Sequence, residues 1–207
     1  MSVDPSSLTS FTAFSGQRRI ATGSISEVAL AVKSWLDAGR DSVLIFDDGS
    51  GQQIDLDLRG TPDEAVERLA QHPWLSAQRE KAERRTGPGR PKLGVTSREV
   101  SLLPRHWDWL NEQPGGASAT LRKLVEARMK ETSGRDRARK AHDAALKFAW
   151  VMGGNLPDFE EASRALSRKE YERLDALTSA WPEDIRNHLK ALATRAAQAE
   201  QEANDDD

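Results

Sequence analysis

The alternation of apolar and polar residues near the N-terminus predicts a β-hairpin. Within positions 8–14, Phe11 and Ala13 point to one side of an extended chain, and the even-numbered residues point to the other. Residues 15–17 suit a turn, and residues 18–22 can return as the partner strand.

A row of apolar residues near helical spacing follows over 25–36 and ends before Gly39. Ser24 or Ser26 can cap this helix, and Glu27, three residues after Ser24, would complete a capping box. The spacing therefore predicts a helix directly after the hairpin.

The pattern returns to strands after this helix. Residues 42–46 are a short apolar run, residues 47–51 are rich in Asp and Gly and suit a tight turn, and residues 53–58 alternate cleanly. Thr61 as a cap and Pro62 as the first helical residue then open a second helix. The order ββαββα favours an antiparallel sheet backed by helices.

The C-terminal part has helical spacing almost throughout. We expect helices over 137–150 and 157–166, a third that Ser167 caps and that ends at Leu177, and a fourth that begins at Pro182. The last residues are polar and acidic, which is typical of a frayed tail.

These patterns together predict an α+β protein with five parts. The parts are a small α+β unit at 1–74, a basic Gly/Pro linker at 75–96, a strand-helix-helix unit at 97–132, a helical region at 133–200 and an acidic disordered tail at 201–207.

Charge is distributed unevenly along the 207 residues, although the net charge is only −3. Residues 79–140 contain 16 basic and 8 acidic residues, a balance of +8, whereas residues 1–78 and 141–207 balance at −5 and −6. A basic middle between acidic flanks indicates which part could meet a polyanion. A solvated linker followed by amphipathic helices would give the same distribution.

Residues 97–132 show a pattern of their own. Residues 98–103 suit a short strand, Pro104 can open a helix, residues 114–116 end that helix, and Ser118 is a good N-cap for the next one. The apolar stripe of the second helix is Leu121, Leu124, Val125 and Met129.

This layout resembles the ribbon-helix-helix fold of the Arc- and MetJ-like repressors. The resemblance implies that two protomers pair their strands into one antiparallel ribbon, which enters the major groove of DNA. It also implies that backbone amides at the start of the second helix, where Gly116 and Ser118 match the pattern, hold a phosphate.

Two registers of the strand are open. If Val100 and Leu102 point inward, the outward residues are polar; if the register shifts by one, Arg98 points outward together with those two apolar residues. We favour the first register because it buries two apolar side chains. Trp107 and Trp109 cannot share one face of a helix, so we expect one of them to be exposed or to lie in an interface.

The linker adds a second possible contact with DNA. Residues 87–92 resemble a degenerate AT-hook, in which Arg90 and Pro91 match the motif and Pro88 replaces its first arginine. Arginine is attracted to the negative potential of a narrow minor groove. The stretch at residues 87–92 is also compatible with a solvated linker that makes no contact with DNA.

Several classes of function are not supported by the residues. The chain has no cysteine, its four histidines lack metal-ligand spacing, and the alternation at 53–58 explains Asp55 and Asp57 as a solvated face. We therefore expect no catalytic site, metal or cofactor. No apolar run approaches a membrane span, and the first residues do not resemble a secretory signal, so we expect a cytoplasmic protein.

Characteristic short stretches are spread over most of the chain, at residues 11–23, 27–33, 44–48, 55–60, 89–94, 98–100, 102–110 and 113–118. Together and in this order they are similar to an uncharacterised bacterial family, domain-of-unknown-function family 2239. The resemblance implies a bacterial protein and supplies no activity, ligand or site.

We expect a homodimeric DNA-binding protein, with regulation of transcription as the role that this would suggest. The expected DNA contacts are Arg84, Arg85, Arg90, Lys92, Arg98, Arg105, Ser118, Arg122 and Lys123. The expected interface residues are Val100, Leu102, Trp107 and Trp109. The alternative is a module that binds another protein and no nucleic acid.

Overall fold

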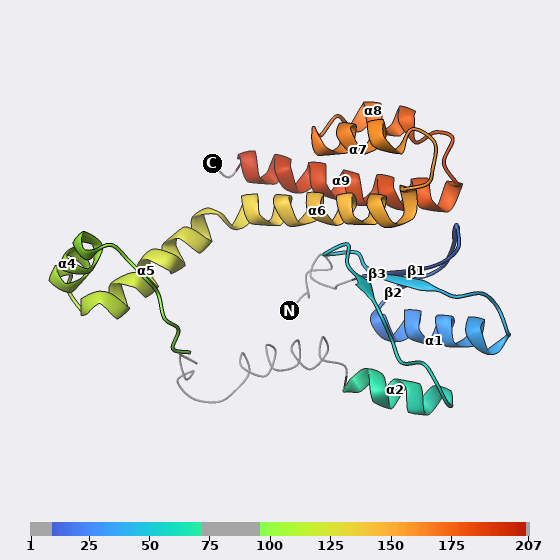
Figure 1. Cartoon of the computed structure of the whole chain (residues 1–207), viewed down its shortest axis with the longest axis horizontal. Helices are drawn as coiled ribbons and strands as arrows, with labels where there is room; N and C mark the ends of the chain where they lie inside the picture. Colours follow the sequence, from blue (N-terminus) through green and yellow to red (C-terminus); the bar gives the residue numbers. More distant parts are fainter. Residues whose placement is uncertain (1–9, 72–95, 206–207) are drawn as a thin grey trace.

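The computed structural model describes residues 10–71 and 96–205. It confirms the α+β class: the N-terminal part forms a small antiparallel sheet with two helices, and the C-terminal part is helical (Figure 1). None of the helices in these two ranges has the length and apolar content that crossing a membrane requires.

The sheet has four strands, and each neighbouring pair is antiparallel. The strands are β1 (Phe11–Ser15), β2 (Arg18–Gly23), β3 (Leu44–Asp47) and β4 (Gln53–Ile54), in the order β2-β1-β3-β4. The predicted hairpin is confirmed, but β4 covers only two of the residues expected at 53–58. The residues after β4 keep the alternation without strand pairing, with Asp57 exposed and Leu58 buried.

Two helices, α1 (Ile25–Asp37) and α2 (Pro62–Ala70), belong to the N-terminal part. Each begins with a complete capping box, in which Ser24 pairs with Glu27 and Thr61 with Glu64. Both predicted helix starts are therefore confirmed. The helices bury one face of the sheet in a cluster that joins Phe11, Ala13 and Ile45 of the strands to Val28, Val32 and Leu69 of the helices.

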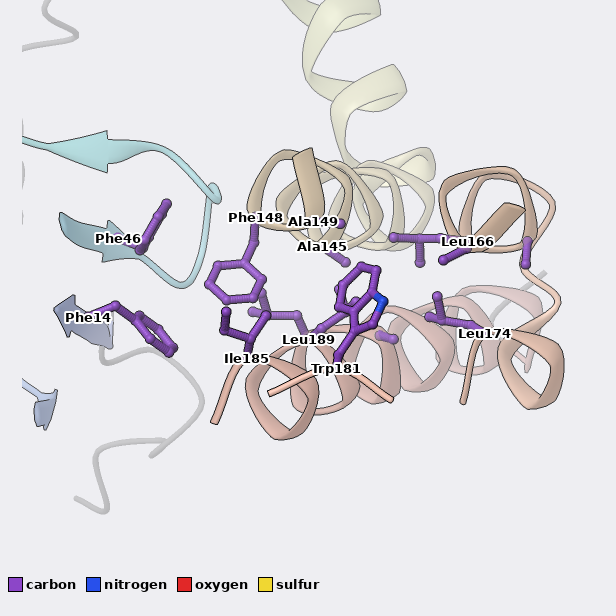
Figure 2. Packing of buried hydrophobic residues seen from close by; sticks show 14 residues of the cluster. Phe14, Phe46, Ala145, Phe148, Ala149, Leu166, Leu174, Trp181, Ile185 and Leu189 are labelled. Atoms are coloured by element: carbon purple, nitrogen blue, oxygen red, sulfur yellow. The ribbon is translucent and has the colours of Figure 1, made fainter. Parts of the chain in front are cut away.

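The C-terminal part covers the other face of the sheet. It consists of α6 (Ser133–Gly153), α7 (Phe159–Ser167), α8 (Tyr171–Leu177) and α9 (Glu183–Asp205), of which α6 and α9 lie next to the sheet. Phe14 of β1 and Phe46 of β3 pack against Phe148 of α6, with ring centroids 5.5 and 5.2 Å apart (Figure 2). The sheet is thus a middle layer, and the segments expected at 1–74 and 133–200 share one hydrophobic core.

The long helices α6 and α9 lie side by side (Figure 1). Alanines at their contact, among them Ala145, Ala149 and Ala193, are buried and bring the two helix backbones close together. Trp181 fills the end of the core beside Gly153, and its indole Nε1 donates a hydrogen bond of 2.8 Å to the carbonyl oxygen of Pro157.

Two expected features of the C-terminal part differ in the structure. Ser167 is the last residue of α7, where its hydroxyl donates to the Ser163 carbonyl, so Glu170 and not Ser167 stands at the start of α8. α9 continues to Asp205 because Ala203 packs against Gly134 of α6. The first five residues of the expected disordered tail are therefore helical.

Helices α4 (Pro104–Glu112) and α5 (Gly116–Glu131) lie away from this core and join it through the start of α6 (Figure 1). Thr132, between α5 and α6, bonds to both helices: its hydroxyl donates to the Arg128 carbonyl at 2.9 Å and lies 3.1 Å from Asp136 Oδ2. The basic linker expected at 75–96 lies outside the described residues except for its last residue.

Candidate functional site

The candidate site is the 96–131 segment, which consists of an extended stretch followed by α4 and α5. Leu110 of α4 is buried. The turn between them passes through Gly115 and Gly116 at φ values of 92° and 75°, in the left-handed region that glycine adopts without strain. The predicted end of the first helix at 114–116 is therefore confirmed.

The expected strand at 98–103 does not form within the single chain, where residues 96–103 are neither helix nor strand. Val100 is exposed and Leu102 is only partly buried. In the ribbon-helix-helix arrangement the partner strand comes from a second chain, so a lone chain has no hydrogen-bond partner to offer. The register with Val100 and Leu102 inward stays a prediction about a dimer.

The apolar row of α5 faces solvent in the single chain. None of the residues of α5 is buried, and Leu124, Val125 and Met129 are 49%, 56% and 66% exposed. An amphipathic helix normally buries its apolar stripe against a neighbouring element. Trp107 and Trp109 of α4 are both more than one third exposed, whereas their spacing on a helix predicts this of one of them.

The four basic residues among the expected DNA contacts on this segment are all exposed: Arg98, Arg105, Arg122 and Lys123. Within the described part of the chain none of these four side chains makes an ion pair, whereas Arg128 pairs with Glu131. The four charges are therefore available to an external polyanion.

The prediction that Ser118 caps α5 is wrong. The helix begins at Gly116, Gly115 stands in the capping position, and no side chain caps the helix. The two glycines reach left-handed conformations that start the helix two residues before Ser118. The first N–H groups of α5 lack a side-chain acceptor, and such a helix start attracts anions.

The remaining expected DNA contacts are in the linker. Arg84, Arg85, Arg90 and Lys92 lie outside the described residues. Of the expected DNA contacts, the structure therefore describes only those in the 96–131 segment.

Metal binding has no support among the residues that the structure describes, since no three His, Asp or Glu side chains there converge on one point. Asp47 instead accepts hydrogen bonds from Gly49 N and Ser50 Oγ and shapes its own turn. Hydrogen bonds and charge from Arg59 hold the pKa of Asp57 well below its usual range. These contacts give the carboxylates of Asp47 and Asp57 partners within the chain.

One buried polar cluster has no signature in the sequence. His188 Nε2 of α9 lies 3.2 Å from Asp48 Oδ1, and Thr12 Oγ1 donates to Asp48 Oδ2 at 2.9 Å. Arg195 also donates to the Asp48 carbonyl oxygen at 2.9 Å, and the rings of Phe14 and Phe148 enclose the imidazole. Asp48 and His188 are too deeply buried to meet a substrate. No sequence signal joins residues this far apart, so only the fold reveals the cluster.

Comparison with known proteins identifies a family and no function. The model of a family described as an uncharacterised protein conserved in bacteria (DUF2239) matches residues 10–193. No curated protein and no solved structure matches the chain.

Proposed function

This chain belongs to the DUF2239 family of uncharacterised bacterial proteins, and within that family we propose that it is a dimeric DNA-binding protein. In this proposal the 96–131 segments of two copies pair around a two-fold axis, and the paired surface binds DNA. The role is binding and not catalysis, and regulation of transcription is the function that this would serve.

The exposed apolar row of α5 is the observation that carries the proposal. Leu124, Val125 and Met129 share one side of a helix that buries none of its residues. Val100 and Leu103, in the extended stretch before α4, are also more than half exposed. Apolar side chains gathered in this way mark an interaction surface.

A second copy suits this surface better than an unrelated protein because two features of the segment are unpartnered within the described ranges. The extended stretch at 98–103 pairs with no strand there, and the apolar row of α5 is left exposed. A two-fold related copy supplies both, since each copy brings the same stretch and the same helix. Pairing would also satisfy the backbone hydrogen bonds of the stretch.

The charges of the segment favour DNA as the ligand of such a dimer. Arg98, Arg105, Arg122 and Lys123 are exposed and make no ion pair in the described ranges, and a dimer presents each of them twice. The uncapped start of α5 adds partial positive charge beside Arg122 and Lys123. The AT-hook-like residues Arg90 and Lys92 precede the segment in the sequence and would contribute further contacts.

Fluorescence anisotropy of a labelled mixed-sequence duplex, titrated at several salt concentrations, tests the proposal. We expect binding whose logarithmic salt slope is about −3 or steeper, since at least four phosphates are contacted. Arg122→Ala with Lys123→Ala, and separately Arg90→Ala with Lys92→Ala, should weaken binding and flatten the slope. Arg164→Ala with Arg173→Ala, on α7 and α8, is the matched control and should change neither.

Light scattering at micromolar concentration tests the dimer independently. Leu124→Glu with Met129→Glu should convert a dimer to a monomer and abolish DNA binding. Absence of binding at low salt, or a wild-type monomer, would overturn the proposal. A dimer that does not bind DNA would favour the second candidate function, a protein-binding module. In such a module the exposed Trp107 and Trp109 would supply the contact surface.

A further inference from the structure

The basic residues of the N-terminal part divide into two groups. Those that pair with aspartates are Lys33, Arg59 and Arg68. Those that make no ion pair within the described ranges are Arg18, Arg19 and Arg40. Two residues of the second group, Arg18 and Arg40, lie over the same side chain, that of Trp35 in α1. The unpaired cations of this part are therefore not scattered over its surface.

Trp35 brings together two arginines from different parts of the fold. Arg18 is the first residue of β2, and Arg40 follows α1. The Cζ atom of Arg40 lies 4.4 Å from the centroid of the Trp35 ring, and the Cζ atom of Arg18 lies 5.7 Å from it. A cation–π contact neutralises no charge, and a guanidinium has five N–H donors. The contacts with the indole therefore hold both cations in place and leave donors free for an external acceptor.

The indole adds another donor that has no acceptor. Nε1 of Trp35 is buried and has no hydrogen-bond partner in the part of the chain that the structure describes. Such an atom is uncommon in a folded protein, because burial removes its hydrogen bond to water. We call Arg18, Trp35 and Arg40 the arginine–tryptophan cluster. An oxygen atom held between the guanidinium groups would give the indole N–H the acceptor that it lacks.

The acidic groups around the arginine–tryptophan cluster do not pair with its arginines. Asp41 directly follows Arg40 and is exposed, but it makes no ion pair in the described ranges. Asp37 pairs with Lys33, and Asp184 of α9 accepts a hydrogen bond from the backbone N–H of Arg19. The end of α1 contributes only the partial negative charge of its carbonyl groups. The two guanidinium groups thus remain available to a carboxylate from outside the chain.

From these observations we propose that the arginine–tryptophan cluster is a docking site for a short acidic segment of a partner protein. Its carboxylates would bind the guanidinium groups of Arg18 and Arg40 and accept a hydrogen bond from Nε1 of Trp35. Arginine binds carboxylates through two parallel hydrogen bonds, and arginine and tryptophan are the residue types that contribute most to binding at protein interfaces. The site lies outside the 96–131 segment and does not depend on DNA binding there.

The charge of the surroundings favours a short segment over a DNA duplex at this site. Residues 1–78 have a balance of −5, so the surface outside the cluster is acidic on average. A duplex is a long, densely charged rod that would meet this acidic surface as well as the two arginines. A short peptide can place its carboxylates at the cluster alone.

NMR spectroscopy of the ¹⁵N-labelled full chain, titrated with a hexaglutamate peptide at low salt, tests the proposal. Trp35→Phe identifies the indole signal of Trp35 among those of the six tryptophans. We expect this signal to move downfield, because the N–H gains an acceptor, and to saturate with a Kd of about 1 mM or tighter. Arg18→Gln with Arg40→Gln should lower the affinity about tenfold or more.

Three further variants show whether the response belongs to the arginine–tryptophan cluster. Arg59→Gln, at an exposed arginine of the same part that pairs with Asp57, is the matched control and should not change the titration of Trp35. Asp41→Asn should raise the affinity, because it removes a competing carboxylate. Arg122→Ala with Lys123→Ala should not change the titration either, so a failure of the DNA-binding proposal leaves this test intact.

A Trp35 signal that does not respond to the peptide would overturn the proposal, as would equal titrations of the wild type and the double glutamine variant. An equal response to inorganic phosphate at the same concentration would also overturn it, because the cluster would then bind any free oxyanion. A response to a DNA duplex that exceeds the response to the peptide would assign the cluster to the DNA-binding surface instead.

Discussion

His188 Nε2 lies 3.2 Å from Asp48 Oδ1 at the point where the sheet meets the C-terminal helices. Asp48 follows β3 and His188 belongs to α9, so the contact joins the two halves of the sequence. Phe14 and Phe148 pack around the imidazole and extend the hydrophobic core across the same junction. The N-terminal sheet and the C-terminal helices are therefore parts of one folded body.

Asp48→Ala should destabilise this body. The change removes the acceptor of the Thr12 hydroxyl and the carboxylate that lies 3.2 Å from the buried His188 imidazole. Loss of one partner of a buried polar pair costs about 2–4 kcal/mol. Urea denaturation followed by circular dichroism measures the effect. Asp55→Ala, at an exposed aspartate, is the control and should change the free energy of unfolding by less than about 0.5 kcal/mol. Equal effects of the two variants would show that the contacts of Asp48 contribute nothing to the free energy of unfolding.

Gly51→Ala should also be strongly destabilising. Gly51 has a φ of 67°, and a Cβ there would lie 2.3 Å from the carbonyl oxygen of Ala144 in α6. Gly39→Ala is a matched control, since its φ of 69° imposes the same backbone strain with nothing within 4 Å of the new Cβ. We expect about 1–2 kcal/mol of destabilisation at Gly39 and at least about 2 kcal/mol more at Gly51.

Thermal or urea denaturation of both glycine variants gives the difference directly. Because the two positions share their backbone conformation, the difference isolates the close approach of the turn after β3 to α6. Equal free energies of unfolding for the two variants would mean that this approach is absent in solution.

The features that the sequence predicts well are local. The capping boxes of Ser24 with Glu27 and Thr61 with Glu64 bring together residues three apart, and both form as expected. The alternation in β1 predicts two faces, but it does not say what covers the face of Phe14. That contact depends on Phe148, which belongs to a helix far along the chain.

The candidate sites show the same division. The apolar stripe of α5 is visible in the sequence, but its exposure is not, because helical spacing looks the same whether or not a neighbour covers the helix. The prediction that Ser118 caps α5 is wrong because Gly115 and Gly116 adopt left-handed conformations and the helix begins at Gly116. A pocket that α6, the start of α8 and α9 form joins His142, Tyr171 and Glu200, and no spacing in the sequence relates these residues.

Val125→Lys with Met129→Lys should leave the stability of the folded body unchanged. Both side chains are more than half exposed, and surface changes of this kind alter the free energy of unfolding by less than about 0.5 kcal/mol. Leu192→Ala, at a buried position of α9, should cost about 2–5 kcal/mol. Chemical denaturation at concentrations where the protein is monomeric compares the two. A large loss in the α5 variant would show that its apolar row packs within its own chain.

The half-buried His142 gives the stability a dependence on pH. Burial is the main cause that lowers its pKa, the charge of Lys169 lowers it further, and Asp143 and Glu200 oppose the shift. The unfolded chain, with a histidine pKa of about 6.5, therefore binds a proton more readily than the folded chain does. The contribution of His142 to the free energy of unfolding is therefore fully present above the unfolded-state pKa. It is lost as the pH falls through the lower pKa of the folded state. His142→Gln should reduce the fall in urea midpoint between about pH 7 and pH 5. Parallel curves for the variant and the wild type would contradict this assignment.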